Sequence, residues 1–239
     1  MLTAMLSYRL AASGAEIIVM GMQDGGVCVL AKNGPRVMIA EAGGDSYDLH
    51  AVKDILSQRG IETVDALTVS KKSDLRSSIA DQLIETYAPD YFFCGGDISQ
   101  YAFAQKAAER QQTEIMPFGG AVTVKSSALS LEMYTDSGGD NWQRLTCGEL
   151  TVLICPDGGN CALLPPEYLH CDAAVIGTQP KNITYLSTGA VILTAEFSEA
   201  SQTAYRLHVK GFKHLYMTSL DGTLICATAD GNLLVQPSN

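Results

Sequence analysis

The feature that most constrains the fold of this chain is a change of pattern near its middle. Between residues 46 and 111, short apolar runs of strand length alternate with segments that have helical periodicity. From residue 113 to 164, one strand-like run follows another. Alternation of strands and helices indicates α/β layering with buried strands. The two patterns together predict an α/β or α+β architecture in which two sheets pack face to face, with helices on the outside.

Turn residues and periodicity set the expected boundaries of the elements. Ser46 can cap a first helix, and Gly60 suits its C-terminal end. Further helices are expected at residues 75–87, 99–111 and 199–209. The expected strands are residues 16–20, 27–32, 36–40, 61–69, 91–94, 121–125, 129–134, 149–155, 160–164, 190–195, 214–217, 223–227 and 233–236. Because no long linker or low-complexity segment interrupts them, residues 16–239 are predicted to form a single domain.

The charge balance is acidic, and it bears on which partners are favoured. The 16 lysines and arginines stand against 26 aspartates and glutamates, which gives a formal net charge of −10. Such a chain repels phosphate backbones at long range, so broad nucleic-acid binding is disfavoured unless positive charge is clustered. No stretch reaches the roughly 20 apolar residues that a transmembrane helix needs. Residues 1–15, with Arg9 inside an apolar run, fit a stub that follows a membrane segment as well as they fit a first strand.

The seven cysteines show no repeated close spacing, and most of them lie in apolar, strand-like runs. This distribution favours buried thiols that act as small apolar side chains. Cys155 and Cys161 flank the turn formed by residues 156–160, so a disulfide bond across a hairpin is an alternative. A zinc site from these two cysteines with His170 and Cys171 is a further alternative, although the spacing matches no common zinc module.

Three stretches carry a resemblance to a known family. Residues 59–70 read Arg-Gly-Ile-Glu-Thr-Val-Asp-Ala-Leu-Thr-Val-Ser, and residues 170–177 read His-Cys-Asp-Ala-Ala-Val-Ile-Gly. Residues 216–225 read Tyr-Met-Thr-Ser-Leu-Asp-Gly-Thr-Leu-Ile. In this order they resemble the metallo-β-lactamase-type domain that closes the ComEC-type DNA-internalisation competence proteins. Glu41 opens a Glu-Ala-Gly triplet where that family has Asp-x-Gly. The resemblance covers residues 16–236 and implies a four-layer αββα sandwich.

The resemblance does not extend to the metal ligands. Zinc hydrolases of this family use a Ser-His-x-Asp/His-x-Asp-His loop and a second loop that ends in His-His-Gly-Ser, because several nitrogen and oxygen ligands must converge on the metal. The ligand positions of the first loop are here Lys71, Ser73, Leu75 and Arg76. Those of the second loop fall on Thr178 and Gln179. The expected bridging aspartate falls on Pro165 and Pro166. The sequence therefore predicts no metal, no other dedicated cofactor and no catalytic residue.

A group of cations stands where the metal loop is expected. Lys71, Lys72 and Arg76 cluster at the predicted start of the second helix, where free N–H groups and the helix dipole also favour anions. If Lys181 approaches from the second loop, fixed cations occupy the space that a metal holds in the family. The hypothesis is a small anion site for a phosphate or a DNA backbone group. The alternative is a solvated basic turn.

The function favoured by the sequence is that of a non-catalytic, metal-free relative of the competence hydrolase domain. By resemblance, the chain is the C-terminal, extracytoplasmic part of a larger membrane protein that assists DNA uptake by scaffolding or weak binding. The implied partners are the rest of that membrane protein and, weakly, DNA or phosphate. One alternative is a metal-independent nuclease or phosphoesterase that uses Lys71, Asp74 and Arg76, with Asp74 as the local base. Another is a protein-interaction module.

Overall fold

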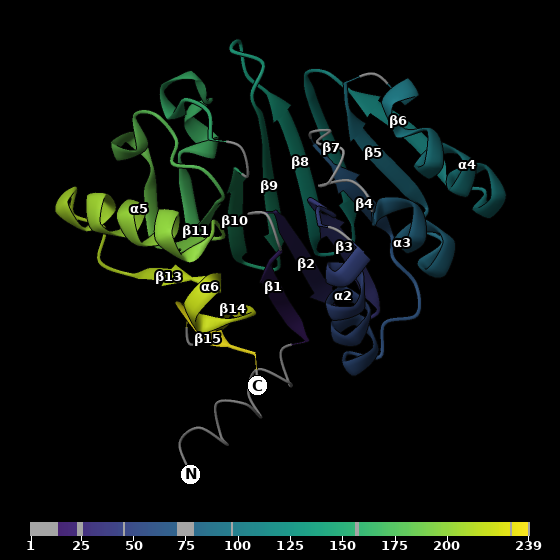
Figure 1. Cartoon of the computed structure of the whole chain (residues 1–239), viewed down its shortest axis with the longest axis horizontal. Helices are drawn as coiled ribbons and strands as arrows, with labels where there is room; N and C mark the ends of the chain where they lie inside the picture. Colours follow the sequence, from purple (N-terminus) through teal and green to yellow (C-terminus); the bar gives the residue numbers. More distant parts are fainter. Residues whose placement is uncertain are drawn as a thin grey trace.

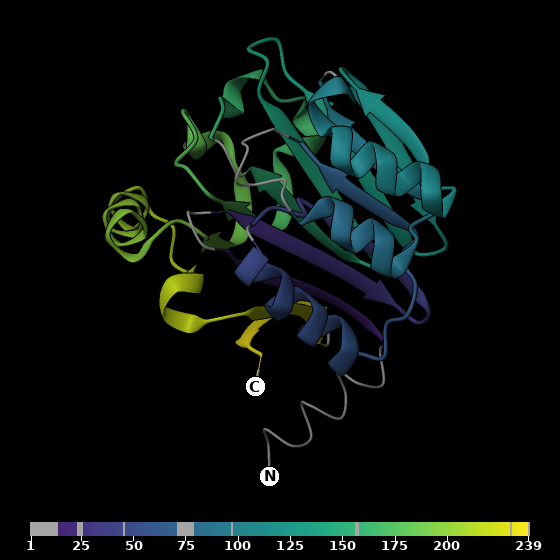
Figure 2. The same cartoon turned by 45° about the vertical axis from the view of Figure 1, so that its right-hand side comes forward.

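The computed structural model describes residues 14–22, 26–44, 46–70, 79–96, 98–155, 158–229 and 231–238. Within these residues the chain forms two stacked sheets that carry helices on their outer faces (Figures 1 and 2). The predicted α/β class and the αββα order of layers are therefore confirmed.

The first sheet has eight strands in the order β15-β14-β1-β2-β3-β4-β5-β6. Strands β3 to β6 pair in parallel, and the remaining neighbours pair antiparallel. The bounds are β1 (Ala15–Gly21), β2 (Val27–Asn33), β3 (Arg36–Ala40), β4 (Ala66–Val69), β5 (Tyr91–Gly95), β6 (Glu114–Phe118), β14 (Leu224–Ala229) and β15 (Asn232–Pro237).

The second sheet has seven strands in the order β13-β12-β11-β10-β9-β8-β7. Strands β10 to β13 pair in parallel, whereas β7 to β10 pair antiparallel. The bounds are β7 (Ala121–Ser126), β8 (Leu129–Thr135), β9 (Asn141–Cys147), β10 (Leu150–Cys155), β11 (His170–Ile176), β12 (Ser187–Leu193) and β13 (Leu215–Met217).

Helices cover both outer faces of the stacked sheets. Three of them, α2 (Ser46–Gln58), α3 (Ala80–Tyr87) and α4 (Ala102–Gln111), lie on one side of the molecule, and α5 (Phe197–Val209) lies on the other (Figures 1 and 2). The shorter helices are α6 (Thr218–Asp221), η2 (Ile98–Tyr101), η3 (Cys161–Leu163), η4 (Pro166–Tyr168) and η5 (Ile183–Tyr185). None of the described helices is long and apolar enough to cross a membrane.

The alternation of side chains along the strands divides the core into three apolar layers. One face of β2 contributes Cys28 and Leu30 to the layer under α2, α3 and α4. The opposite face contributes Val27, Val29 and Ala31 to the layer between the sheets. A third layer lies between the second sheet and α5, with Trp142 as its largest fully buried side chain. Each sheet is therefore buried on both faces over much of its area, as the continuous apolar runs of its strands predict.

The structure corrects the predicted strand at residues 160–164. Cys161–Leu163 form the 3₁₀ helix η3, and the Asn160 side chain accepts a hydrogen bond from Ala162 N at 3.1 Å. Such local bonds compete with strand pairing, and the two prolines that follow disfavour a ladder. The expected hairpin between Cys155 and Cys161 does not form, because β10 pairs in parallel with β11 instead.

Strands β6 and β9, which lie in the segment between residues 113 and 147, are not among the predicted strands. At the N-terminal end, residues 1–13 of the expected stub lie outside the described residues, and β1 begins at Ala15. The helix expected at 75–87 is described only from α3 onward, since residues 71–78 are also outside.

Candidate functional site

Two sets of parallel strands end at one edge of the sandwich. In the first sheet, Glu41 directly follows β3 and Ser70 directly follows β4. In the second sheet, Ile154 near the end of β10 pairs with Gln143 of β9. The Gln143 side chain reaches across to Glu41, so the ends of both sets lie together. We call Glu41, Thr68, Ser70, Asn141 and Gln143 the polar edge.

The Glu41 carboxyl group is the centre of the polar edge. It accepts a hydrogen bond from Ser70 N at 2.8 Å and another from Gln143 Nε2. The Thr68 hydroxyl donates to Gln143 Oε1 at 2.7 Å and accepts from Glu41 N at 3.1 Å. All four residues are buried. Because buried polar groups are costly without partners, this set of mutual bonds fixes the two sheets relative to each other.

The backbone of Ser70 is held from both sides. Its carbonyl oxygen accepts from Asn141 Nδ2 at 2.7 Å, and Asn141 Oδ1 accepts from the Thr135 hydroxyl at 2.7 Å. Gly95 packs directly against this carbonyl, since any Cβ at Gly95 would overlap it. Glu41 itself has a left-handed backbone with φ 52°, which costs a non-glycine residue roughly 1 kcal/mol that the network offsets. The polar edge therefore fixes the backbone of Ser70 at the end of β4.

The residues predicted to replace the metal ligands are only partly described. Lys71, Lys72, Ser73, Leu75 and Arg76 lie outside the described residues. Thr178 and Gln179 follow β11, the first exposed and the second half-buried. The predicted meeting of Lys181 with the loop cations stays a prediction.

Lys181 itself is held against a neighbouring turn. Its backbone N–H donates to Gly159 O at 2.7 Å, and its carbonyl accepts from Cys161 N at 3.0 Å. The side chain is exposed. The segment that would present Lys181 to an anion is therefore anchored by its backbone.

The position assigned to the bridging aspartate needs revision. Pro165 and Pro166 lie at the N-terminal end of η4, which precedes β11, and do not directly follow a strand. The strand that runs into the polar edge is β10, which ends at Cys155. Asp157 follows two residues later in the sequence and lies outside the described residues. The predicted strand at residues 160–164 placed the expected bridging aspartate too far toward the C-terminus.

The side chains that the structure describes at this edge do not by themselves make a zinc site. Among the described residues, no three His, Cys, Asp or Glu side chains come together as a metal would require, and this includes the alternative set of Cys155, Cys161, His170 and Cys171. The Glu41 carboxyl group is bonded to a backbone amide and to Gln143. Zinc is held by imidazole, thiolate and carboxylate groups, not by lysine, arginine or leucine side chains. No catalytic step through a metal follows from these residues.

A groove of about 560 Å³ lies beside this edge, where the ends of β1 and β12 meet α5 and α6. Asp48, Glu196, Thr194 and Thr218 are among its lining residues. Thr194 Oγ1 is buried and has no hydrogen-bond partner among the described residues, and the same holds for Ser70 Oγ. Hydroxyl and carboxyl groups thus dominate the polar part of this surface, and it offers none of the imidazole ligands of the hydrolase family.

The cysteines are thiols held in apolar surroundings. Burial raises the pKa of Cys94, Cys161 and Cys171 to about 11. Burial, together with the charges of Glu41 and Asp48, also raises the pKa of Cys28. Cys161 is a free buried thiol, so the disulfide bond with Cys155 that the sequence left open is not formed. These thiols are poor nucleophiles at neutral pH, because the thiolate is the reactive form.

Comparison with solved structures identifies the fold. The metallo-β-lactamase fold protein YhfI from Bacillus subtilis superimposes with a TM-score of 0.65 at 11% sequence identity, over 92% of this chain and 99% of that protein. A diphosphatase from the PhnP family superimposes with a TM-score of 0.52 at 10% identity, over 92% of this chain and 97% of that one. Neither protein-family models nor curated proteins match the sequence. The chain therefore has the metallo-β-lactamase fold, and its chemistry must be argued from its own side chains.

The first prediction concerns the link between the sheets. Replacing Gln143 with leucine keeps the volume but removes one donor to Glu41 and the acceptor of the Thr68 hydroxyl. We expect Gln143→Leu to lower the free energy of unfolding by about 3 kcal/mol, measured by urea denaturation. Gln202→Leu on the exposed face of α5 is the matched control, and it should change stability by less than about 0.5 kcal/mol. Equal stability of the two variants would contradict the role assigned to the network.

The second prediction concerns alkaline pH. The folded chain holds the thiol protons of Cys94, Cys161 and Cys171 more tightly than the unfolded chain, whose thiols have the ordinary pKa of 9.0. The resulting stability is present below pH 9 and is lost as pH rises through about 11. We expect the unfolding free energy, measured in reductant, to fall over this interval. Cys94→Ala should make the fall shallower. A constant free energy up to pH 11 would show that these thiols ionise normally.

Proposed function

We propose that this chain is a non-catalytic, metal-free domain of metallo-β-lactamase fold that acts as a scaffold with weak anion or DNA binding. The observation that carries the proposal is the bonding of Glu41. Its Oε1 atom accepts hydrogen bonds from Ser70 N and Gln143 Nε2 within the polar edge. The strand ends around it present hydroxyl and amide groups, and the sequence after Ser70 has Lys71, Ser73, Leu75 and Arg76 at the positions that the family resemblance assigns to metal ligands.

The same proposal places the chain in a DNA-uptake competence membrane protein, as its extracytoplasmic part. The support comes from the three stretches that resemble the ComEC-type family. They correspond to well-defined elements, since residues 59–70 lead into and through β4, residues 170–177 include β11, and residues 216–225 run from β13 through α6 into β14. The net charge of −10 favours scaffolding over tight binding of DNA, because the acidic chain repels a polyanion at long range.

The third prediction tests the absence of a metal centre. After incubation with zinc or manganese and desalting, we expect less than about 0.1 equivalent of metal per chain by elemental analysis. In parallel, hydrolysis of bis(p-nitrophenyl) phosphate and of a diphosphate ester should not exceed the uncatalysed rate with either metal.

Two other outcomes would each replace the proposal. Binding of a nearly stoichiometric amount of metal would favour a metal-dependent hydrolase centre instead. Asp157 would then be the first candidate ligand. Metal-independent hydrolysis that is lost in Asp74→Asn would establish the nuclease or phosphoesterase alternative, because Asp74 is the local candidate for a general base.

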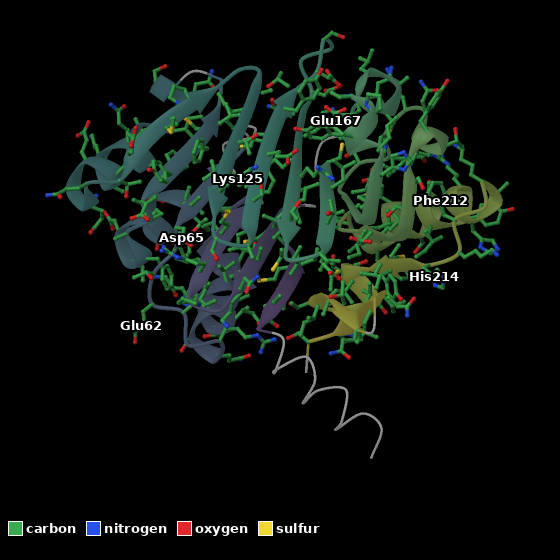
Figure 3. The ribbon with its side chains drawn as sticks, turned by 180° about the vertical axis from the view of Figure 1, so that it is seen from behind. Glu62, Asp65, Lys125, Glu167, Phe212 and His214 are labelled. Atoms are coloured by element: carbon green, nitrogen blue, oxygen red, sulfur yellow. The ribbon has the colours of Figure 1, made fainter. Side chains whose placement is uncertain are left out.

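The fourth prediction tests the anion site at the loop. Phosphate titrated into the protein in a calorimeter should bind more weakly to Lys71→Ala and to Arg76→Ala than to the parent chain. A decrease of about tenfold is expected for each, since a charge-assisted hydrogen bond contributes on the order of 1.5–3 kcal/mol. Lys125→Ala, an exposed lysine of β7 that is labelled in Figure 3, is the control. Unchanged binding in the loop variants would rule out the loop as the anion site.

A further inference from the structure

A second concave region lies at the opposite end of the second sheet, and we call it the basal pocket. It has a volume of about 450 Å³ and is lined by residues from two segments. One segment runs from η5 into the first half of β12, and the other is the connection 210–214 between α5 and β13. Because β11 to β13 all run toward the polar edge, the basal pocket lies at their N-terminal ends. The seven residues of β12 place it about 20 Å from the polar edge.

The basal pocket gathers positive charge in an acidic chain. Lys210, Lys213 and His214 line it and are exposed, and no lining residue is acidic. Among the described residues, neither lysine forms an ion pair, whereas Arg36, Arg59, Arg110 and Arg144 each pair with a carboxylate. The cations of the basal pocket are therefore available to a ligand, and the charge facing that ligand is uniformly positive or neutral.

A backbone donor adds to these side chains. Strand β13 pairs with β12 only from Val191 onward, and Val191 N donates to His214 O at 2.9 Å. Residues two apart in a strand direct their N–H groups to the same side. The N–H of Gly189 is therefore expected to point to the side of β12 on which Val191 bonds to His214. No described strand lies beside Gly189 there. This amide faces the basal pocket, and Ser187 and Thr184 contribute hydroxyl groups to the same lining.

The connection that carries the lysines is held in shape. Lys210 N and Phe212 N both donate to Leu207 O, at 3.0 and 3.1 Å, and Gly211 N donates to His208 O at 3.0 Å. Gly211 has φ +98°, which only glycine adopts without strain. Figure 3 shows Phe212 and His214 along the connection between α5 and β13. Because the loop is fixed before binding, little conformational entropy is lost when a ligand arrives.

We propose that the basal pocket binds a small phosphate-bearing ligand. The phosphate oxygens accept hydrogen bonds from the Lys210 and Lys213 ammonium groups, the Gly189 amide and the lining hydroxyls. A volume of about 450 Å³ falls in the usual range for small-molecule pockets and exceeds what a phosphate ion fills. The Phe212 ring provides an apolar wall for the rest of a phosphomonoester. None of the residues of the proposed anion site at Lys71, Lys72, Arg76 and Lys181 lines this pocket, and the inference does not rest on the proposed function.

The fifth prediction is tested by amide NMR spectroscopy on the Lys71→Ala/Lys72→Ala/Arg76→Ala variant, which removes the three clustered cations of the proposed anion site. Inorganic phosphate and thymidine monophosphate are titrated separately, and the Gly189 and Gly211 amide signals are followed. Both signals should shift to saturation with at least one probe. Tighter binding of the ester identifies an organic phosphate as the ligand class, and tighter binding of the ion identifies free phosphate.

Matched variants decide whether the lysines are responsible. Adding Lys210→Ala and Lys213→Ala should weaken binding of the preferred probe by about tenfold or more, whereas adding Lys125→Ala should leave it unchanged. Each variant is first shown to be folded by its circular dichroism and its thermal transition. The proposal is overturned if the two glycine amides do not shift, or if the folded Lys210→Ala/Lys213→Ala variant binds both probes like its parent.

Discussion

The two sheets of this fold are joined at one end through a buried carboxyl group, and several other features depend on that bond set. Glu41 needs donors because a buried carboxyl group without them is costly. It obtains one from Ser70 N in its own sheet and one from Gln143 in the other sheet. Asn141 and Gly95 then fix the Ser70 carbonyl. As a result, the ends of β3 and β4 and the start of β9 cannot shift independently.

The same interaction defines what the central carboxyl group does in the frame of the fold. A metal hydrolase must point several ligands outward at one position. Here the central carboxyl group points back to a backbone amide and an amide side chain, so it stabilises the frame of the site. The structural neighbours share the frame at 11% and 10% identity, which establishes fold alone. Activity depends on the side chains placed on that frame, so it must be tested on this chain directly.

The sequence predicted the parts of the fold that depend on local pattern. The Asn33-Gly34 turn predicts the β2–β3 hairpin, and the structure pairs Asn33 with Arg36. The sequence did not predict β6, because this exposed edge strand contains Pro117 and has little apolar alternation. The contact between Glu41 and Gln143 spans 102 residues and arises only when the sheets stack. No spacing along the chain could reveal it, and the same is true of the basal pocket, whose walls are two separated segments.

The two ends of the second sheet use polar groups in opposite ways. At the polar edge the donors and acceptors largely satisfy one another, so the groups stabilise the fold and have little capacity left for a ligand. At the basal pocket, lysine side chains and a strand amide face the solvent beside an apolar ring. Counterions screen charges beyond about 8 Å at physiological ionic strength, so these cations act mainly within the basal pocket. A long polyanion would also meet the field of a chain with net charge −10. This distribution of charge favours a small anion over a nucleic-acid strand at that end of the sheet.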